Sequence, residues 1–237
     1  MTFLGIDLGW AAGVSGGCVV QWDGHRLHMM ELVHLGSFAE VLAWVDRWQS
    51  DDCVIAIDAP TVIPNATGMR DCDRHAHHHF GRYHAGAYPM NLGLPAATKL
   101  LAFSGALELR GYRHAAGMSA RSSGRFQIEV FPHPAHIRLF GLDHIIRYKK
   151  GPVESRVQEL MRLRELMLTH LPSLEPALLP DLPLVGGRGK ALKSVEDRLD
   201  SVVCAYIAAH TWYWGPARTQ VLGDVEKGFM VVPVVKL

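Results

Sequence analysis

Apolar residues dominate the first ten positions of the chain and predict a strand buried on both faces, at the centre of a sheet. Asp7 is the charged residue within this run. A lone carboxylate in a buried strand costs several kcal/mol unless it is paired, hydrogen-bonded or bound to a cation. Asp7 therefore needs an opposite charge, a hydrogen-bond donor or a bound cation beside it.

The pattern continues as a three-stranded antiparallel meander. Glycines mark a turn after the first strand, a second strand is predicted over 15–22, and Asp23-Gly24 is a hairpin signal before a third strand over 26–35. The wholly apolar run 53–57 follows a predicted helix, and a helical crossover implies that this strand lies parallel to the first.

Polar residues mark the start of that helix and the end of the strand that follows it. Ser37 and Glu40 have the spacing of a capping box, and apolar residues at helical spacing follow them. Asp58 ends the strand over 53–57, at the carboxyl edge where α/β sheets place their ligands. Asp7 and Asp58 should therefore lie close together.

Between about 65 and 125 the regular pattern changes. This segment contains a histidine-dense stretch at 75–84, loop residues, and a helix predicted over 96–109. We interpret the whole segment as an insertion that lies over the carboxyl edge of the sheet.

The second half of the chain returns to regular elements. Glu129 lies within a predicted strand, and Ser194 is expected to cap the final long helix, with Asp197 at the capping-box position. The predicted elements are a strand over 126–131 stopped by Pro132-His133-Pro134, a short helical turn over 135–140, helices over 152–171 and 195–214, and an edge strand over 228–235.

Composition is typical of a single globular domain covering residues 1–237. Hydrophobic residues make up 49% and charged residues 20%, and the net charge of +1 argues against broad coating by nucleic acid, although local basic patches remain possible. No apolar run approaches the roughly 18 residues of a membrane span, and no signal pattern opens the sequence. The scattered cysteines are typical of reduced thiols, so we expect a cytoplasmic protein without membrane contact.

Acidic residues supply the strongest functional signal. Asp197 and Asp200 are three apart on a predicted helix, so both face one direction. Together with Asp7 and Asp58 they would place several carboxylates in one small volume, where like charges repel unless a cation is bound. Mg²⁺ or Mn²⁺ prefer oxygen ligands, and two such ions about 3.5–4 Å apart can clamp both oxygens in phosphodiester hydrolysis.

The order of elements resembles the ribonuclease H-like fold, an α/β mixed sheet flanked by helices. The acidic pair on the last helix resembles that of Holliday-junction resolvases in the same superfamily. More closely, the sequence resembles the domain-of-unknown-function 429 family, predicted ribonuclease H-like nucleases. The matching pieces are Gly5-Ile6-Asp7, Ile57-Asp58-Ala59-Pro60, Arg70-x-x-Asp73, Glu129-Val130-Phe131-Pro132-His133-Pro134, Lys149-Lys150-x-Gly, Asp197-x-x-Asp200-Ser201 and the tail Gly223–Pro233. The histidines at 75–84 are a departure from the family pattern.

The resemblance and the acidic pattern together imply a metal-dependent nuclease or phosphodiesterase acting on nucleic acid or a nucleotide-like phosphate ester. The candidate residues fall into three groups: catalytic Asp7, Asp58, Glu129 and Asp200; metal-binding Asp7, Asp58, Asp197 and Asp200; and substrate-binding Arg70, Asp73, Arg82, His133, Lys149 and Lys150.

Simpler structural roles remain open for several of these residues. Asp7 could cap a turn, and Asp197 could stabilise a helix N-terminus. Glu129 could pair with a nearby lysine or with an arginine of the insertion. His75 and His79 have the i,i+4 spacing of zinc ligands, but without a third ligand or a glutamate base a solvated or substrate-facing helix is favoured.

Two other functions are compatible with the sequence. The Gly-x-Asp-x-Gly strand also resembles the phosphate loop of actin-like ATPases and sugar kinases, although this chain is too short for their two domains. A non-catalytic binding module could retain the same fold. Divalent-ion binding separates the nuclease from the binding module, and ATP binding identifies the kinase-like alternative.

Overall fold

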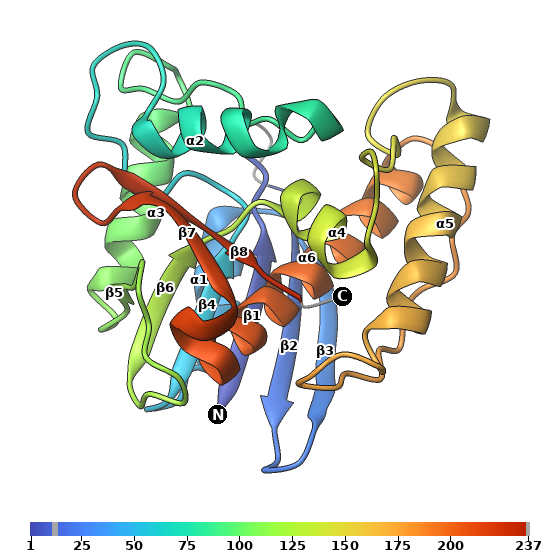
Figure 1. Cartoon of the computed structure of the whole chain (residues 1–237), viewed down its shortest axis with the longest axis horizontal. Helices are drawn as coiled ribbons and strands as arrows, with labels where there is room; N and C mark the ends of the chain where they lie inside the picture. The colour runs from blue at the N-terminus through green and yellow to red at the C-terminus, as the bar shows by residue number, and fades with distance from the viewer. Residues whose placement is uncertain (11–13, 236–237) are drawn as a thin grey trace.

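The computed structural model describes residues 1–10 and 14–235, and a six-stranded mixed sheet lies at its centre (Figure 1). The strand order is β3-β2-β1-β4-β6-β5. The strands are β1 (Thr2–Asp7), β2 (Ser15–Trp22), β3 (Leu27–Leu35), β4 (Cys53–Ile57), β5 (Arg113–His114) and β6 (Arg125–Glu129). β1 to β3 form the predicted antiparallel meander, and β4 lies parallel to β1 as predicted. The α/β mixed sheet is confirmed and is compatible with a ribonuclease H-like fold.

Helices cover both faces of this sheet. They are α1 (Phe38–Trp48), α2 (Asp71–Phe80), α3 (Ala97–Glu108), α4 (Pro132–Phe140), α5 (Val153–His170) and α6 (Lys190–Trp214), with 3₁₀ turns η1 (Gly81–Tyr83) and η2 (Gly215–Arg218). Alternate side chains of β1 point to opposite faces. Leu4 and Ile6 pack in the core beneath α1 and α3, whereas Phe3 packs in the core that α4, α5 and α6 share.

Close contact between α6 and the meander determines where the acidic residues of the helix lie. A Cβ atom at Gly5 would collide with the backbone of Ser201 and Ala205, and one at Gly16 would collide with the carbonyl of Asp197. Glycine is therefore required in β1 and β2 for the helix backbone to approach the sheet. This approach brings the first half of α6 to the end of β1, where Asp7 is located.

The structure corrects three sequence-based expectations. α6 begins at Lys190, so Ser194 and Asp197 lie inside the helix and do not form its capping box. The Pro132-His133-Pro134 segment opens α4, because proline is tolerated in a first helical turn. The C-terminal strand β8 (Gly228–Pro233) pairs with an unpredicted strand, β7 (Thr219–Asp224), in a separate two-stranded sheet.

The segment over 65–125 carries α2, η1, α3 and the short strand β5, which pairs with β6 at the edge of the main sheet. In Figure 1, α2 lies across the upper end of the sheet, towards which β1 and β4 run. Among the described residues, no helix has both the length and the apolar character that a membrane crossing needs.

Candidate functional site

Three predicted acids come together at the carboxyl edge of the sheet. Asp7 ends β1, Asp58 follows β4, and Asp200 lies in α6. Since Ile6 and Ile57 point to the α1/α3 side, their successors Asp7 and Asp58 point towards α6. We call Asp7, Asp58 and Asp200 the carboxylate site.

Lys149 is the nearest cation to this site. Its Nζ lies 2.9 Å from Oδ2 of Asp200, and the Tyr148 hydroxyl donates a 2.7 Å hydrogen bond to Oδ1 of the same carboxylate. Burial disfavours the charge of Lys149, but the carboxylates around it outweigh that effect and raise its pKa well above the usual value. Burial also acts against ionisation of Asp200, yet Lys149 and its other neighbours hold the pKa of Asp200 below its ordinary value.

Asp7 and Asp58 are less well compensated. Burial, followed by repulsion from Asp200 and Asp58, raises the pKa of Asp7 well above its usual value even though Lys149 opposes the shift. Burial, with repulsion from Asp200 and then from Glu129, raises the pKa of Asp58 to about 7, although Lys149 opposes this shift as well. Neither carboxylate has a described salt-bridge partner within 4.0 Å. The site therefore holds more negative charge than the protein's own cations neutralise.

Asp197 lies one helical turn before Asp200 but has polar partners of its own. Lys193 Nζ is 2.7 Å from one of its oxygens, and His34 Nε2 is 3.1 Å from the other. Its charge contributes to the raised pKa of Asp7, so it borders the site. Asp197 is consequently better placed at the margin of the carboxylate site than among its central members.

Glu129 is not part of the carboxylate site. It pairs in register with Ile57 and not with Asp58, so it points to the opposite face of the sheet. There its two oxygens accept hydrogen bonds of 2.6 and 2.8 Å from the guanidinium of Arg70. The alternative in which Glu129 pairs with an arginine of the insertion is the one that the structure shows.

Arg70 and Asp73 share this buried contact with Glu129, and we call these three residues the Arg70 network. Arg70 Nη2 is 2.7 Å from Asp73, and its Nη1 also donates to the carbonyl of Val62 at 3.0 Å. Both side chains are fully buried. The structure therefore does not place Arg70 or Asp73 where a substrate could contact them, because protein groups already occupy their polar atoms.

The remaining predicted substrate ligands are dispersed. Arg82 is exposed in η1 and stacks on the ring of Tyr83, and Lys150 is exposed, with its Nζ 3.1 Å from the Tyr88 hydroxyl. His133 lies in α4, with its ring 5.6 Å from that of Tyr148, and burial lowers its pKa to about 3. Of this predicted group, Lys149 is the residue that directly contacts a member of the carboxylate site.

Two residues near Asp200 were not identified from the sequence. His136 is fully buried, neither ring nitrogen has a hydrogen-bond partner among the described residues, and burial lowers its pKa to about 4. Tyr148 is buried and holds Asp200. The repeated histidine of Pro132-His133-Pro134-Ala135-His136 was the available sequence signal, because it places both rings in one turn of α4.

The histidines of α2 are separate from this site. His75, His77, His78 and His79 are all exposed. Within residues 1–10 and 14–235, no three histidine, cysteine, aspartate or glutamate side chains are arranged so that they could hold a metal ion as they stand. The four cysteines are buried and free.

Comparison with known proteins identifies the family. A model described as "Protein of unknown function (DUF429)" matches residues 5–226, from the second half of β1 to the end of the hairpin strand β7. No curated protein matches the sequence. The chain belongs to the DUF429 family.

Proposed function

We propose that this protein is a divalent-metal-dependent phosphodiesterase of the ribonuclease H-like class, which hydrolyses nucleic acid or a nucleotide-like phosphate ester. The observation that carries this proposal is the convergence of Asp7, Asp58 and Asp200, from separate elements, at the carboxyl edge of the sheet. The fold positions them through the glycines that let α6 approach the meander.

The chemistry of the donor set fits Mg²⁺ or Mn²⁺. These ions prefer carboxylate oxygens, and the site has an excess of negative charge that raises the pKa of Asp7 and Asp58. Side chains must shift for direct ligation, because no described group is arranged to hold a metal as it stands. We assign Asp7, Asp58 and Asp200 as ligands, with Asp197 at the margin. A bound divalent ion would supply an activated water and neutralise charge on the phosphate.

The protein's own residues would position the substrate around that centre. Lys149 lies beside Asp200, so its ammonium can donate to a phosphate oxygen held at the site. Exposed Lys150 and Arg82 are candidates for neighbouring phosphates. Lys149 holds the pKa of Asp200 down, and the hydrogen bond from Tyr148 orients the carboxylate.

One observation favours a second candidate, a non-catalytic binding module. Lys149 already pairs with Asp200, and a lysine can act as a permanent counter-ion in place of a metal. In that case the carboxylate site would be a structural feature, and divalent ions would not bind there.

The experiment that tests the proposed function is hydrolysis of bis-p-nitrophenyl phosphate and of single- and double-stranded oligonucleotides with Mg²⁺ or Mn²⁺. We expect metal-dependent cleavage that falls at least about 100-fold in Asp7→Asn and is unchanged in Asp181→Asn, an exposed aspartate. Cleavage that survives in Asp7→Asn, or its absence from all substrates in the wild type, would contradict the proposal.

A further inference from the structure

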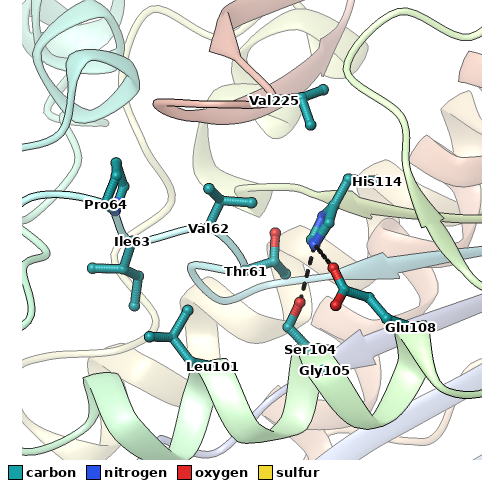
Figure 2. A pocket seen from close by; sticks show the side chains of 10 residues that line it. All are labelled: Thr61, Val62, Ile63, Pro64, Leu101, Ser104, Gly105, Glu108, His114 and Val225. Carbon is teal, nitrogen blue, oxygen red and sulfur yellow. Dashed lines mark hydrogen bonds and ion pairs between the residues drawn. The ribbon is translucent and has the colours of Figure 1, made fainter.

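A cavity of about 420 Å³ lies next to the strand end that carries Asp58 (Figure 2). Its walls come from the segment after β4, from α3, from β5 and from the tip of the β7–β8 hairpin. Cavities of roughly 300–1,000 Å³ with a few convergent polar groups are typical of small-molecule sites. Neither the carboxylate site nor the family match accounts for this cavity.

One end of the cavity is polar. His114 Nε2 lies 3.2 Å from the Ser104 hydroxyl and 3.1 Å from the Glu108 carboxylate, and Figure 2 shows these three side chains converging. Thr61 lines the same cavity (Figure 2). Its hydroxyl is buried and has no hydrogen-bond partner among the described residues. An unpaired buried hydroxyl is unfavourable, so a ligand that bonds to it would recover that loss.

The rest of the cavity is apolar. Ile63 and Leu101 lie at the other end from His114, and Val225 approaches from the hairpin tip opposite α3 (Figure 2). Apolar walls with polar groups at one end suit a flat ring that has hydrogen-bonding groups along one edge. The Glu108 carboxylate at the polar end disfavours an anionic group and favours a hydrogen-bond donor.

The cavity wall is rigid and close to the carboxylate site. Thr61 follows Asp58 by three residues, so their Cα atoms lie within about 11 Å of each other. The Thr61 N–H donates to Glu129 at 2.9 Å, and Arg70 donates to the Val62 carbonyl at 3.0 Å. The Arg70 network thus fixes the segment that connects Asp58 to the cavity.

We propose that this cavity binds the base of the substrate, a purine or pyrimidine that presents an exocyclic amino group to the polar end. The placement of its phosphate at the carboxylate site rests on the proposed function, whereas binding of the base does not. Thr61 and Glu108 would accept hydrogen bonds from the amino group, and the apolar walls would enclose the ring. The proposal makes the enzyme selective for nucleotides that carry adenine, cytosine or guanine.

Gly105 provides a variant that blocks the cavity without disturbing the fold. It lies in α3 at the cavity wall, and a Cβ placed there meets no atom within 4 Å. Gly105→Phe should therefore fill the cavity, while replacement of a helical glycine supports the helix. Ala102→Phe adds the same ring at an exposed position of the same helix and serves as the matched control.

The test is saturation-transfer NMR and calorimetry with adenosine, cytidine and uridine in metal-free buffer. We expect adenosine and cytidine to bind the wild type at least 5-fold more tightly than uridine. Gly105→Phe should weaken that binding at least 10-fold, whereas Ala102→Phe and Asp7→Asn should leave it unchanged. Thr61→Val, which removes the hydroxyl at constant shape, should reduce the preference over uridine.

The proposal is overturned if the wild type binds no nucleoside, if Gly105→Phe binds as well as the wild type, or if Asp7→Asn abolishes binding. Calorimetric titration of Mn²⁺ into the wild type and the same variants measures metal binding at the carboxylate site independently of nucleoside binding. Absence of Mn²⁺ binding by the wild type would reject the proposed function, and nucleoside binding would still decide the role of the cavity.

Discussion

The carboxylate site and the Arg70 network both bury acidic side chains near the carboxyl edge of the sheet, but they differ in how the charge is compensated. Glu129 and Asp73 share the guanidinium of Arg70, and backbone N–H groups of Thr61 and Met90 complete their hydrogen bonds. Among the described residues, Lys149 is the cation that contacts the carboxylate site, through Asp200, and Lys193 acts on Asp58 from farther away.

This difference distinguishes a structural from a functional arrangement of acids. In the Arg70 network the polar atoms are satisfied within the protein, so no external ligand is needed. Burial raises the pKa of Asp7, Asp58 and Glu129 alike, but Glu129 keeps its two hydrogen bonds to Arg70, whereas Asp7 and Asp58 have no described salt-bridge partner within 4.0 Å. Of the two clusters, the carboxylate site is the one that a cation would stabilise, because its negative charge is incompletely neutralised.

The largest effect is expected when the Arg70 network is broken. Arg70→Met leaves Glu129 and Asp73 buried without a counter-ion and should lower the free energy of unfolding by about 3–5 kcal/mol. Urea denaturation measures this change, with the exposed Arg82→Met as control, expected within about 0.5 kcal/mol of the wild type. A loss below about 1 kcal/mol for Arg70→Met would show that the network is not structural.

Removal of the lysine at the carboxylate site should have a smaller effect that metal can reverse. Lys149→Met leaves Asp200 unpaired and should destabilise the metal-free protein at pH 8 by about 2 kcal/mol, because the side chain of Lys149 is partly exposed. Mn²⁺ should restore most of this loss, as thermal unfolding with and without the ion would show. Lys150→Met is the neighbouring control, and equal destabilisation of both variants would contradict the assignment.

Metal affinity should increase with pH. The pKa of Asp58 is about 7 and that of Asp7 is raised well above its usual value, so a metal must displace a proton from Asp58 below pH 7. We expect Mn²⁺ affinity to rise about fivefold from pH 6 to pH 7 and to level off above pH 8. Calorimetry in buffers of different ionisation enthalpy detects the released protons, and a flat profile would exclude both aspartates as ligands.

The smallest expected effect is an increase in the free energy of unfolding when Asp58 is replaced. A carboxyl whose pKa is raised on folding binds its proton more tightly in the native state, so it lowers stability as pH rises from about 4 to 7. Asp58→Asn removes this penalty and should stabilise the metal-free protein by about 1 kcal/mol at pH 8 and by less at pH 5. A stability loss at pH 8, measured by urea denaturation, would show that Asp58 has a structural role.

Much of the fold follows from local signals in the sequence. The strand over 15–22 and the parallel strand over 53–57 were predicted with the bounds that the structure shows, because their apolar runs end at clear turn residues. The start of α6 was missed because Ser194 and Asp197 have capping-box spacing, whereas the helix begins after Gly189. The β7–β8 pairing was missed because β7 has a weak apolar pattern.

Part of the candidate site was also predicted from local signals in the sequence. Asp7, Asp58 and Asp200 were recognised as residues at strand ends and on a helix face, and the structure brings them together. Glu129 was grouped with them as an acid within a predicted strand, but sheet register decides its direction, and a shift of one residue reverses it. Partners such as Tyr148 and His136 come from loops and short helices whose position depends on tertiary packing.

The central claim is that the carboxylate site binds a divalent cation. Isothermal titration of Mg²⁺ and Mn²⁺ into the wild type, Asp7→Asn and Asp181→Asn at pH 8 tests this claim most directly. We predict binding at millimolar or lower concentrations to the wild type and Asp181→Asn, and its loss in Asp7→Asn. Equal binding by all three proteins, or none by the wild type, would contradict the account and make Asp7 a structural acid.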